Sequence, residues 1–439
     1  MLSRRAINPM AEDDALPPAA VREILLRLPA DQRARAACVC RRWREVVADP
    51  GLWTVLDLTV EGGVSVDVTA ERLLAAAARA QGRLEVLNVP DDSELFPSVL
   101  AVATANAPTL RELRTLSFDN YEWEDGQNDG ILGVDDLQAL LLAAPALQLL
   151  EGSVTCTLAV AHRLLRREPP FGPVRLWELD IDCKAASRDI ASLAADLVTQ
   201  PSLRSIGING FENFSLTLDE LDSVVNAALA LRLDMLRLYD CELTPAAVPA
   251  LCRVLSSTAL TSLSVMQLHS WTWLLDETAA VGFAEALRAN RTLTSLTLNN
   301  VLKNSRDKAV LLLSLVGHAS LRTLRCTCEL SANPVFIGEQ GDPVLIGLSL
   351  GALIAANAPE LAGLDVSMSH LGDAGLGPLC DALPRNTHLR WLSVRWNGMS
   401  AAFAAQRLLP AVRANESLRL LEADDVADEA VRLVNARRA

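Results

Sequence analysis

The sequence predicts an α/β solenoid, in which short parallel strands alternate with helices, preceded by a small helical module. The first observation is a frame of apolar residues, Leu-x-x-Leu-x-Leu, that recurs roughly every 30 residues along most of the chain. The second is the composition. Half of the 439 residues are apolar but only 4% are aromatic, so the core must be built from Leu, Ala and Val.

The repeated frame begins thirteen times, and the third unit could equally begin at Leu110. Its first position is occupied in turn by Trp53, Leu84, Leu113, Leu147, Leu176, Leu203, Leu233, Leu260, Leu293, Leu321, Leu361, Leu389 and Leu418. The first residue starts a strand, and the fourth and sixth residues point into the core because side chains alternate along a strand. One unit cannot bury its own apolar face, so neighbouring units must stack.

Helical segments are expected between these strands. Apolar residues recur at three-to-four spacing in Val68–Ala80, Leu218–Leu231, Thr244–Leu255 and Asp373–Leu383. Parallel strands pack about 4.8 Å apart, whereas helices need about 8–10 Å. The stack is therefore expected to curve, with the strands on its concave side and the helices outside.

The units resemble the ribonuclease-inhibitor class of leucine-rich repeats, most closely over residues 361–397. That class carries a polar residue three positions after the sixth strand position, which is present here at Cys241 and Asn397. The resemblance implies a horseshoe of leucine-rich repeats. We assign residues 54–425 to this solenoid and residues 426–439 to a C-terminal capping helix.

The first 53 residues predict a different module. Val21, Ile24, Leu25 and Leu28 form one helical stripe, and Val39 and Trp43 lie on a second. A segment of this size cannot bury enough surface to fold alone, so its stripes must pack against something else. We expect a flexible segment over residues 1–14 and three short helices over residues 15–53.

These residues are similar to an F-box. The matching positions, in order, are Leu16-Pro17, Ile24-Leu25, Leu28-Pro29, Val39-Cys40, Arg42-Trp43, Asp49-Pro50 and Leu52-Trp53. Two positions depart from the family pattern, Ala19 in place of an acid and Arg33 in place of Leu, and either could weaken binding to an adaptor.

The resemblance implies docking to a Skp-type adaptor, and through it to a cullin and a RING subunit. The implied contact residues are Leu16, Pro17, Ile24, Leu28, Val39 and Trp43. The alternative is that the stripes only cap the first repeat, a role that Leu52 and Trp53 are expected to fill in either case.

Charge and composition exclude several classes of function. The net charge is −14, although residues 16–53 carry seven arginines against four acidic residues, so the bulk surface does not favour nucleic acid or anionic membrane. The longest apolar runs are too short to span a membrane. Nine scattered cysteines and no signal sequence indicate a reduced protein of the cytoplasm, the nucleus or both. No catalytic motif or metal-ligand spacing occurs, so we expect no enzyme activity and no cofactor.

A protein target is expected on the concave face, where the second, third, fifth and seventh strand positions point outward. The candidate contact residues are Arg237, Tyr239, Arg325, Trp391 and Arg395, because arginine and aromatic residues dominate binding energies. Trp391 or Trp396 could instead cover the edge of the last repeat. Residues 178–182 are interpreted as a solvated acidic patch, and residues 119–132, 267–276 and 331–343 as insertions.

The sequence thus predicts the substrate-recognition subunit of an SCF-type (Skp–cullin–F-box) ubiquitin ligase. The alternative is a leucine-rich-repeat scaffold, sensor or GTPase-regulating protein with a vestigial F-box. Adaptor binding separates the two, because only the ligase function requires it.

Overall fold

A computed structural model describes residues 17–28, 30–39, 41–58, 69–89, 93–118, 133–184, 190–211, 214–267, 274–302, 304–327 and 342–438. The chain divides into two compact units. The first comprises Met1–Cys156 and Arg167–Trp177, and the second comprises Thr157–Arg166 and Glu178–Ala439. The predicted insertion at 119–132, and most of those at 267–276 and 331–343, lie outside the described residues.

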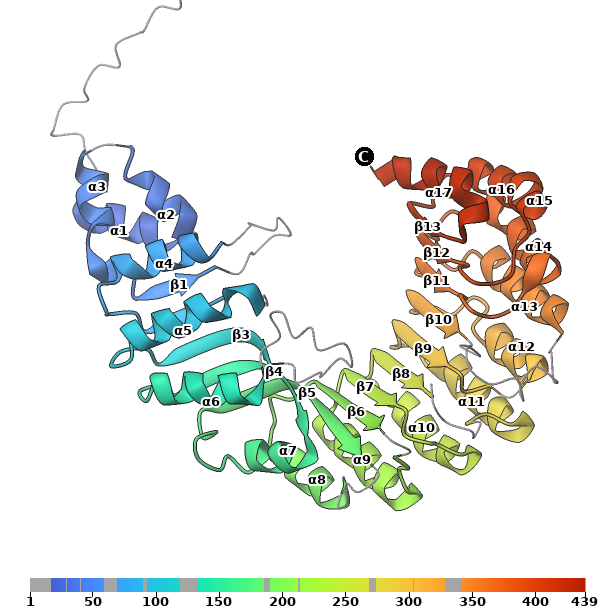
Figure 1. The fold of residues 1–439 in the computed structure, drawn as a ribbon, viewed down its shortest axis with the longest axis horizontal. Helices are drawn as coiled ribbons and strands as arrows, with labels where there is room; N and C mark the ends of the chain where they lie inside the picture. The colour runs from blue at the N-terminus through green and yellow to red at the C-terminus, as the bar shows by residue number, and fades with distance from the viewer. Residues whose placement is uncertain are drawn as a thin grey trace, which may run out of the picture. The chain divides into compact units, whose positions relative to one another are not determined.

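The first unit begins with three helices and continues with strand–helix repeats (Figure 1). Its elements are α1 (Pro18–Leu26), α2 (Ala30–Ala36), α3 (Arg41–Val47), η2 (Pro50–Leu52), β1 (Val55–Asp57), α4 (Ala70–Arg79), β2 (Val86–Asn88), η3 (Ser93–Leu95), α5 (Phe96–Ala105), β3 (Glu112–Phe118), α6 (Val134–Ala143) and, apart from its last residue, β4 (Leu149–Thr157). Strands β1 to β4 pair in sequence order, each parallel to the next.

The second unit consists of strand–helix repeats throughout. Its strands are β5 (Val174–Lys184, from Glu178 onward), β6 (Ser205–Phe211), β7 (Met235–Tyr239), β8 (Ser262–Met266), β9 (Ser295–Asn299), β10 (Thr323–Thr327), β11 (Gly363–Asp365), β12 (Trp391–Ser393) and β13 (Leu420–Glu422). Its helices are α7 (Leu158–Leu165), α8 (Ile190–Leu197), α9 (Leu218–Leu231), η4 (Pro245–Ala247), α10 (Val248–Leu255), α11 (Glu277–Ala289), α12 (Ser305–Ser314), α13 (Pro343–Ala355), α14 (Gly372–Ala382), η6 (Leu383–Arg385), α15 (Ala401–Phe403), η7 (Ala404–Leu408), α16 (Leu409–Ala414), η8 (Asp425–Ala427), α17 (Asp428–Asn435) and η9 (Ala436–Arg438). Within this unit the helices follow the outer side of the strands (Figure 1).

The strand register agrees with the sequence frame. The fourth residues of successive units lie side by side, as in the pairs Ile206–Leu236 and Leu236–Leu263. These residues are fully buried, so they form the shared core between strands and helices. The predicted fold class, a leucine-rich-repeat solenoid behind a small helical module, is confirmed.

The register also decides where the third unit begins. Leu113 pairs with Leu87, which is the fourth residue of its own unit, and on the other side with Leu150. The third unit therefore starts at Leu110 and not at Leu113. The frame is ambiguous here because Leu110, Leu113 and Leu116 keep the same three-residue spacing.

Two of the predicted helices show how local sequence sets their ends. Leu218–Leu231 is α9 as predicted, and Thr217 begins it with a capping box in which its hydroxyl accepts from the Glu220 N–H. The segment Thr244–Leu255 divides into η4 and α10, each with a proline in its first turn. Proline supplies no N–H, so it is readily accommodated in the first turn of a helix.

The most apolar helix, α13, packs closely against α14. A Cβ on Gly347 would overlap the carbonyl oxygen of Gly375, and one on Gly351 would lie 2.9 Å from the carbonyl oxygen of Pro378. The missing side chains therefore allow the two backbones to touch. Among the described residues no helix, α13 included, is long and apolar enough to cross a membrane.

A series of buried polar side chains, here called the polar ladder, joins the repeats of the second unit. Its members lie three residues before a unit start and are Gln200, Asn290, His318, Asn386 and Asn415. Each faces a carbonyl near the end of the preceding repeat's helix, for example Asn290 Nδ2 donating to Leu255 O at 2.6 Å. The Asn386 Oδ1 accepts from the Leu389 N–H at 2.8 Å, so the same side chain also supports the turn into its own strand.

Candidate partner-binding surfaces

The N-terminal helical module buries some of its apolar residues and exposes others. Val21 and Leu25 of α1 are fully buried, because every fourth residue of a helix faces the same way. Ile24 is 39% exposed, Leu26 42% and Val39 64%. Exposed apolar side chains on so small a module are candidates for contact with another protein.

The structure distributes the predicted adaptor-binding residues unevenly. Pro17, Ile24 and Val39 are exposed, whereas Leu28 and Trp43 are half-buried. Leu16 lies outside the described residues. The binding role of all six remains a prediction.

Arg33, which departs from the F-box pattern, is buried and connects two parts of the first unit by hydrogen bonds. Its side chain is 7% exposed and donates to the carbonyl oxygens of Leu26 and Leu28, at the end of α1. It also donates to Leu52 O at 3.2 Å and Val55 O at 3.1 Å. Burial lowers the pKa of Arg33, and Asp57 opposes that shift. Arg33 therefore holds α1 to the first strand of the repeats.

Leu52 and Trp53 fill the expected place beneath the helical module. Both are buried, and the Trp53 Nε1 donates to Val47 O at 2.8 Å. The guanidinium of Arg79, from α4, lies 4.9 Å from the centroid of the Trp53 ring. The module is thus attached to the repeats through Trp53 and Arg33.

A cavity of about 420 Å³ opens between α2, α3 and α4. Arg44 and Arg79 line it, but so do the C-terminal ends of all three helices, whose carbonyls carry partial negative charge. Arg44 donates to one of these carbonyls, Ala37 O, at 3.3 Å. Arg44 therefore offsets the partial charge of one helix end, and the carbonyls that line the cavity make it less favourable for an anion.

On the strand face of the second unit, Arg237 is already paired. It makes ion pairs with Glu178 and with Asp180, the latter at 2.7 Å, and these side chains are only 17–21% exposed. Burial alone lowers the pKa of Arg237, but the charges and hydrogen bonds of Asp180 and Glu178 raise it overall. The acidic run is therefore not a solvated patch as expected, because two of its carboxylates neutralise a half-buried cation.

Gly207 makes this pairing possible. Asp180, Gly207 and Arg237 occupy the same register position on β5, β6 and β7. A Cβ on Gly207 would overlap the Asp180 carboxylate and lie 3.3 Å from Arg237 Nε. Asp180 and Arg237, two strands apart at one register position, can meet because the middle strand has no side chain there. Tyr239, the other candidate on β7, is half-buried.

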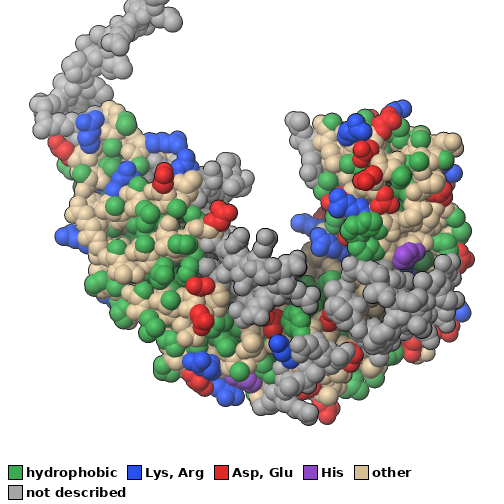
Figure 2. Space-filling view, in the orientation of Figure 1, with side chains coloured by type: hydrophobic (Ala, Val, Ile, Leu, Met, Phe, Trp, Pro, Cys, Tyr) green, Lys and Arg blue, Asp and Glu red, His purple; other side chains and the backbone are tan. Residues whose placement is uncertain are grey.

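A second cross-strand pair lies on β10 to β12. The guanidinium of Arg325 lies 5.2 Å from the centroid of the Trp391 ring, within cation–π range. Gly363 occupies the strand between them, and a Cβ there would lie 2.9 Å from Trp391 Cε3. The indole therefore crosses β11 over a glycine, as Arg237 crosses β6. In Figure 2, Lys or Arg side chains lie beside hydrophobic ones at this inner edge of the C-terminal repeats.

The turn that follows β12 exposes two further large side chains. Arg395 is exposed, and Trp396 is 59% exposed with a left-handed φ of 53°. The Trp396 N–H donates to Asp424 Oδ1 at 2.6 Å, which holds the turn in place. Trp396 is not buried against the last repeat, so covering the edge of the solenoid is not its role.

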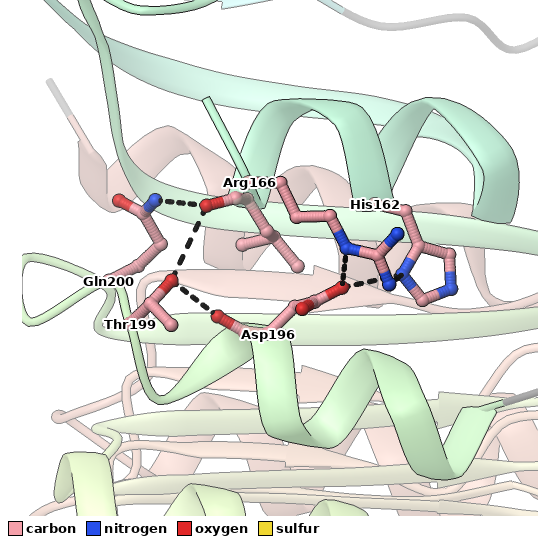
Figure 3. A network of polar contacts seen from close by, with 6 residues as sticks. His162, Arg166, Asp196, Thr199 and Gln200 are labelled. Carbon is pink, nitrogen blue, oxygen red and sulfur yellow. Dashed lines mark hydrogen bonds and ion pairs between the residues drawn. The ribbon is translucent and has the colours of Figure 1, made fainter. Parts of the chain in front are cut away.

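A polar network joins α7 to α8 on the helical side of the second unit (Figure 3). Asp196 Oδ2 lies 2.7 Å from His162 Nδ1 and accepts from Arg166 Nε at 2.9 Å. Thr199 and Gln200 both donate to the Leu165 carbonyl oxygen. The contacts of Asp196 with His162 and Arg166, and those of Thr199 and Gln200 with Leu165, connect one repeat to the next and so serve the stacking of helices. Thr199 also donates to the Asp196 carbonyl oxygen within its own repeat. Among the described residues no three His, Cys, Asp or Glu side chains gather as metal ligands.

Residues 13–59 match the family model F-box-like. The chain is an F-box-like module followed by leucine-rich repeats. No curated protein matches the chain in sequence.

Two solved structures are among those similar to the chain. One is the leucine-rich-repeat-containing protein LegL7 from Legionella pneumophila, at 14% identity over 87% of this chain and 98% of that one, with a TM-score of 0.30. The other is TLR13 in the TLR13–ssRNA13 complex, at 16% identity over 78% of this chain, with a TM-score of 0.28. This chain spans 39% of TLR13.

Several residues that organise these surfaces were missed by sequence reasoning. The roles of Gly207 and Gly363 could not be predicted from a single sequence, because they depend on side chains of neighbouring strands. The polar ladder could have been found, since an Asn recurs three residues before Leu293, Leu389 and Leu418. Arg33 was noticed only as a departure from the family pattern.

Proposed function

We propose that the chain is a non-catalytic substrate receptor of an SCF-type ubiquitin ligase. The F-box-like module would dock a Skp-type adaptor, which joins it to a cullin and a RING subunit, and the repeats would hold a target protein. The single observation that carries this proposal is the F-box-like match at residues 13–59, ahead of a repeat array with a continuous strand face. Such a complex would work in the cytoplasm or the nucleus.

The exposed apolar residues favour docking over capping. A module that only capped the first repeat would bury its apolar stripe against that repeat. Here Leu52 and Trp53, both buried, cover the repeat, while Ile24, Leu26 and Val39 remain exposed. Fully burying a side chain of this size contributes about 1.5–3 kcal/mol. Ile24 and Leu26 still expose about two-fifths of their surface and Val39 more, so a partner that covered all three would gain a part of that energy from each.

The paired state of Arg237 also bears on where a target would bind. Its charge is neutralised by Glu178 and Asp180, whereas Arg325 and Arg395 have no carboxylate within ion-pair distance among the described residues. We therefore place the main target contact over β10 to β12, at Arg325, Trp391 and Arg395. Arg237 and Tyr239, on β7, would lie on the same strand face beside this contact.

The test is co-purification of the full chain with a Skp-type adaptor. A variant carrying Ile24→Asp and Val39→Asp is compared with a matched control, Leu142→Asp, which changes an exposed apolar residue of α6 (73% exposed). We expect wild type and the control to retain the adaptor and the double variant to lose it. If folded wild-type protein retains no adaptor, the ligase proposal is wrong, and the repeats would serve a scaffold.

A further inference from the structure

In several repeats of the second unit, the turn that follows the strand contains a residue in the left-handed conformation. The residue eight positions into a unit is left-handed at Asp240, Asn300, Met368 and Trp396, with φ between 50° and 56°. Asp and Asn tolerate this conformation because their short side chains bond locally, whereas a bulky side chain costs about 1–2 kcal/mol. Met368 and Trp396, in adjacent repeats, are therefore strained at a position where Asp240 and Asn300 are not.

Burial does not compensate for this strain at Trp396. Its side chain is 59% exposed, and the contact that holds the turn comes from its backbone N–H. A strained, exposed aromatic residue that adds nothing to the core indicates a contact outside the chain. The Met368 N–H donates to the Arg395 carbonyl oxygen at 2.9 Å, so the two turns are directly joined.

Two cationic side chains lie on the same repeats. Arg325 is exposed and stacked on Trp391, which pre-organises its guanidinium and leaves the edge donors available. Arg395 is exposed, and within the described ranges no carboxylate comes within ion-pair distance of either arginine. In a chain with a net charge of −14, two such cations mark a place for an anionic group.

Nearby acidic residues restrict what that group is. Asp365 lies beside Arg325 in the strand register, although its carboxylate accepts from the backbone and hydroxyl of Ser367. Glu422 is the last residue of β13, and Asp424 lies two residues after it. A doubly charged phosphate would be repelled by these three carboxylates more strongly than a singly charged carboxylate would. The surroundings therefore favour Glu or Asp over a phosphorylated residue.

We propose that Arg325, Trp391, Arg395, Trp396 and Met368 form a docking surface for a protein segment that carries a carboxylate side chain next to an apolar one. The guanidinium of Arg325 binds the carboxylate, and Trp396 with Met368 covers the apolar residue. This inference deepens the target-binding part of the proposed function and is independent of adaptor binding.

The test uses an array of short synthetic peptides with Glu, Gln, phosphoserine or Lys at one central position and Leu or Ser at the next. The array is probed with the full chain. We expect retention of the peptides with Glu followed by Leu, and weaker retention when Gln replaces Glu or Ser replaces Leu. No retention, or retention of phosphoserine or Lys peptides alone, would overturn the proposal.

Variants then locate the binding on the chain. Arg325→Ala and Trp396→Ala are each expected to weaken binding of the best Glu-Leu peptide by about ten-fold or more, as expected for central contacts. Arg322→Ala is the matched control, because Arg322 belongs to the same repeat but is paired with Glu360 at 3.1 Å. Equal losses in Arg322→Ala and Arg325→Ala would contradict the proposal. Adaptor co-purification by Arg325→Ala stays intact, which separates this failure from failure of the ligase proposal.

Discussion

The guanidinium of Arg237 reaches the carboxylate of Asp180 across the bare backbone of Gly207. The two charged residues are on β7 and β5, and the strand between them contributes no side chain at that position. The same device appears at Gly363, where Trp391 crosses β11 to meet Arg325. At these two positions a glycine on the middle strand lets outward side chains two strands apart meet.

Replacing Gly207 with Ala is expected to destabilise the second unit. The added Cβ would displace the Asp180 carboxylate and break its contact with Arg237, while crowding the sheet. Overpacking of this kind costs about 1–3 kcal/mol. The measurement is the free energy of unfolding in urea. Gly282→Ala in α11 is the control, because nothing lies within 4 Å of the new Cβ and Ala favours a helix. Equal stability of both variants would show that Gly207 is not required for the pairing.

Arg33→Leu restores the residue typical of an F-box but is expected to loosen the joint between α1 and the first strand. It leaves the carbonyl oxygens of Leu28 and Val55 without their charged donor. Hydrogen bonds from charged groups contribute about 1.5–3 kcal/mol each, so we expect a loss of a few kcal/mol in local stability. Hydrogen exchange of residues 17–57 measures it.

Arg27→Leu is the matched control for this change. Arg27 is exposed at the end of α1, and surface substitutions of this kind usually change stability by less than about 0.5 kcal/mol. Unchanged exchange rates in Arg33→Leu would mean that the hydrogen bonds of Arg33 add nothing to the joint.

His318 is expected to make the repeats sensitive to acid. Its Nδ1 faces the N–H groups of Ser320 and Leu321, and its Nε2 lies 3.2 Å from Leu287 O, so the ring must be neutral with its proton on Nε2. Burial, together with Arg291, lowers the pKa of His318 below its ordinary 6.5, although the bond to Leu287 opposes this. The unfolded chain therefore takes up the proton first, and the free energy of unfolding falls as the pH drops below about 6.5.

His318→Asn should remove that part of the acid loss. Asn is the ladder residue at the equivalent positions 290, 386 and 415, where it donates and accepts without titrating. Thermal melts at neutral and mildly acidic pH compare the variant with wild type. His370→Asn, at an exposed position, is the control. It should lose stability in acid as the wild type does, because His318 is still in place. An acid response identical in wild type and His318→Asn would refute the role of the ladder histidine.

Trp396→Asn is expected to raise stability while weakening partner binding. Asn tolerates the left-handed φ of 53°, and the hydrogen bond from the backbone N–H to Asp424 is kept. Relief of the strain is worth about 1 kcal/mol. Met368→Asn, at the same turn position, should act in the same direction. A fall in melting temperature for Trp396→Asn would indicate that the indole packs within the repeats.

The repeats could be predicted because their signal is periodic and local. Leu236 and Leu263 are recognisable from spacing alone, and their burial follows from the alternation of a strand. What could not be predicted depends on register between units. The shift from Leu113 to Leu110, the pairing of Arg237 and the space above Gly363 appear only when strands lie side by side.

The candidate surface was predicted in part, for the same reason. The strand positions of Arg325 and Trp391 predict that both face outward. The sequence does not indicate that these two side chains stack on each other, nor that Arg237 forms ion pairs with two carboxylates. The sequence reports which side chains face outward. It does not report which of them remain available.

The polar ladder gives the second unit a direction. Each ladder side chain reaches backward, as Asn415 does to the carbonyl oxygens of Leu383 and Asn386, and Asn386 does to that of Ile354. A chain leaves the ribosome from its N-terminus, and earlier parts fold first. Every new repeat therefore meets its acceptor already in place, so the array can be completed one repeat at a time during synthesis, without waiting for residues still to be made.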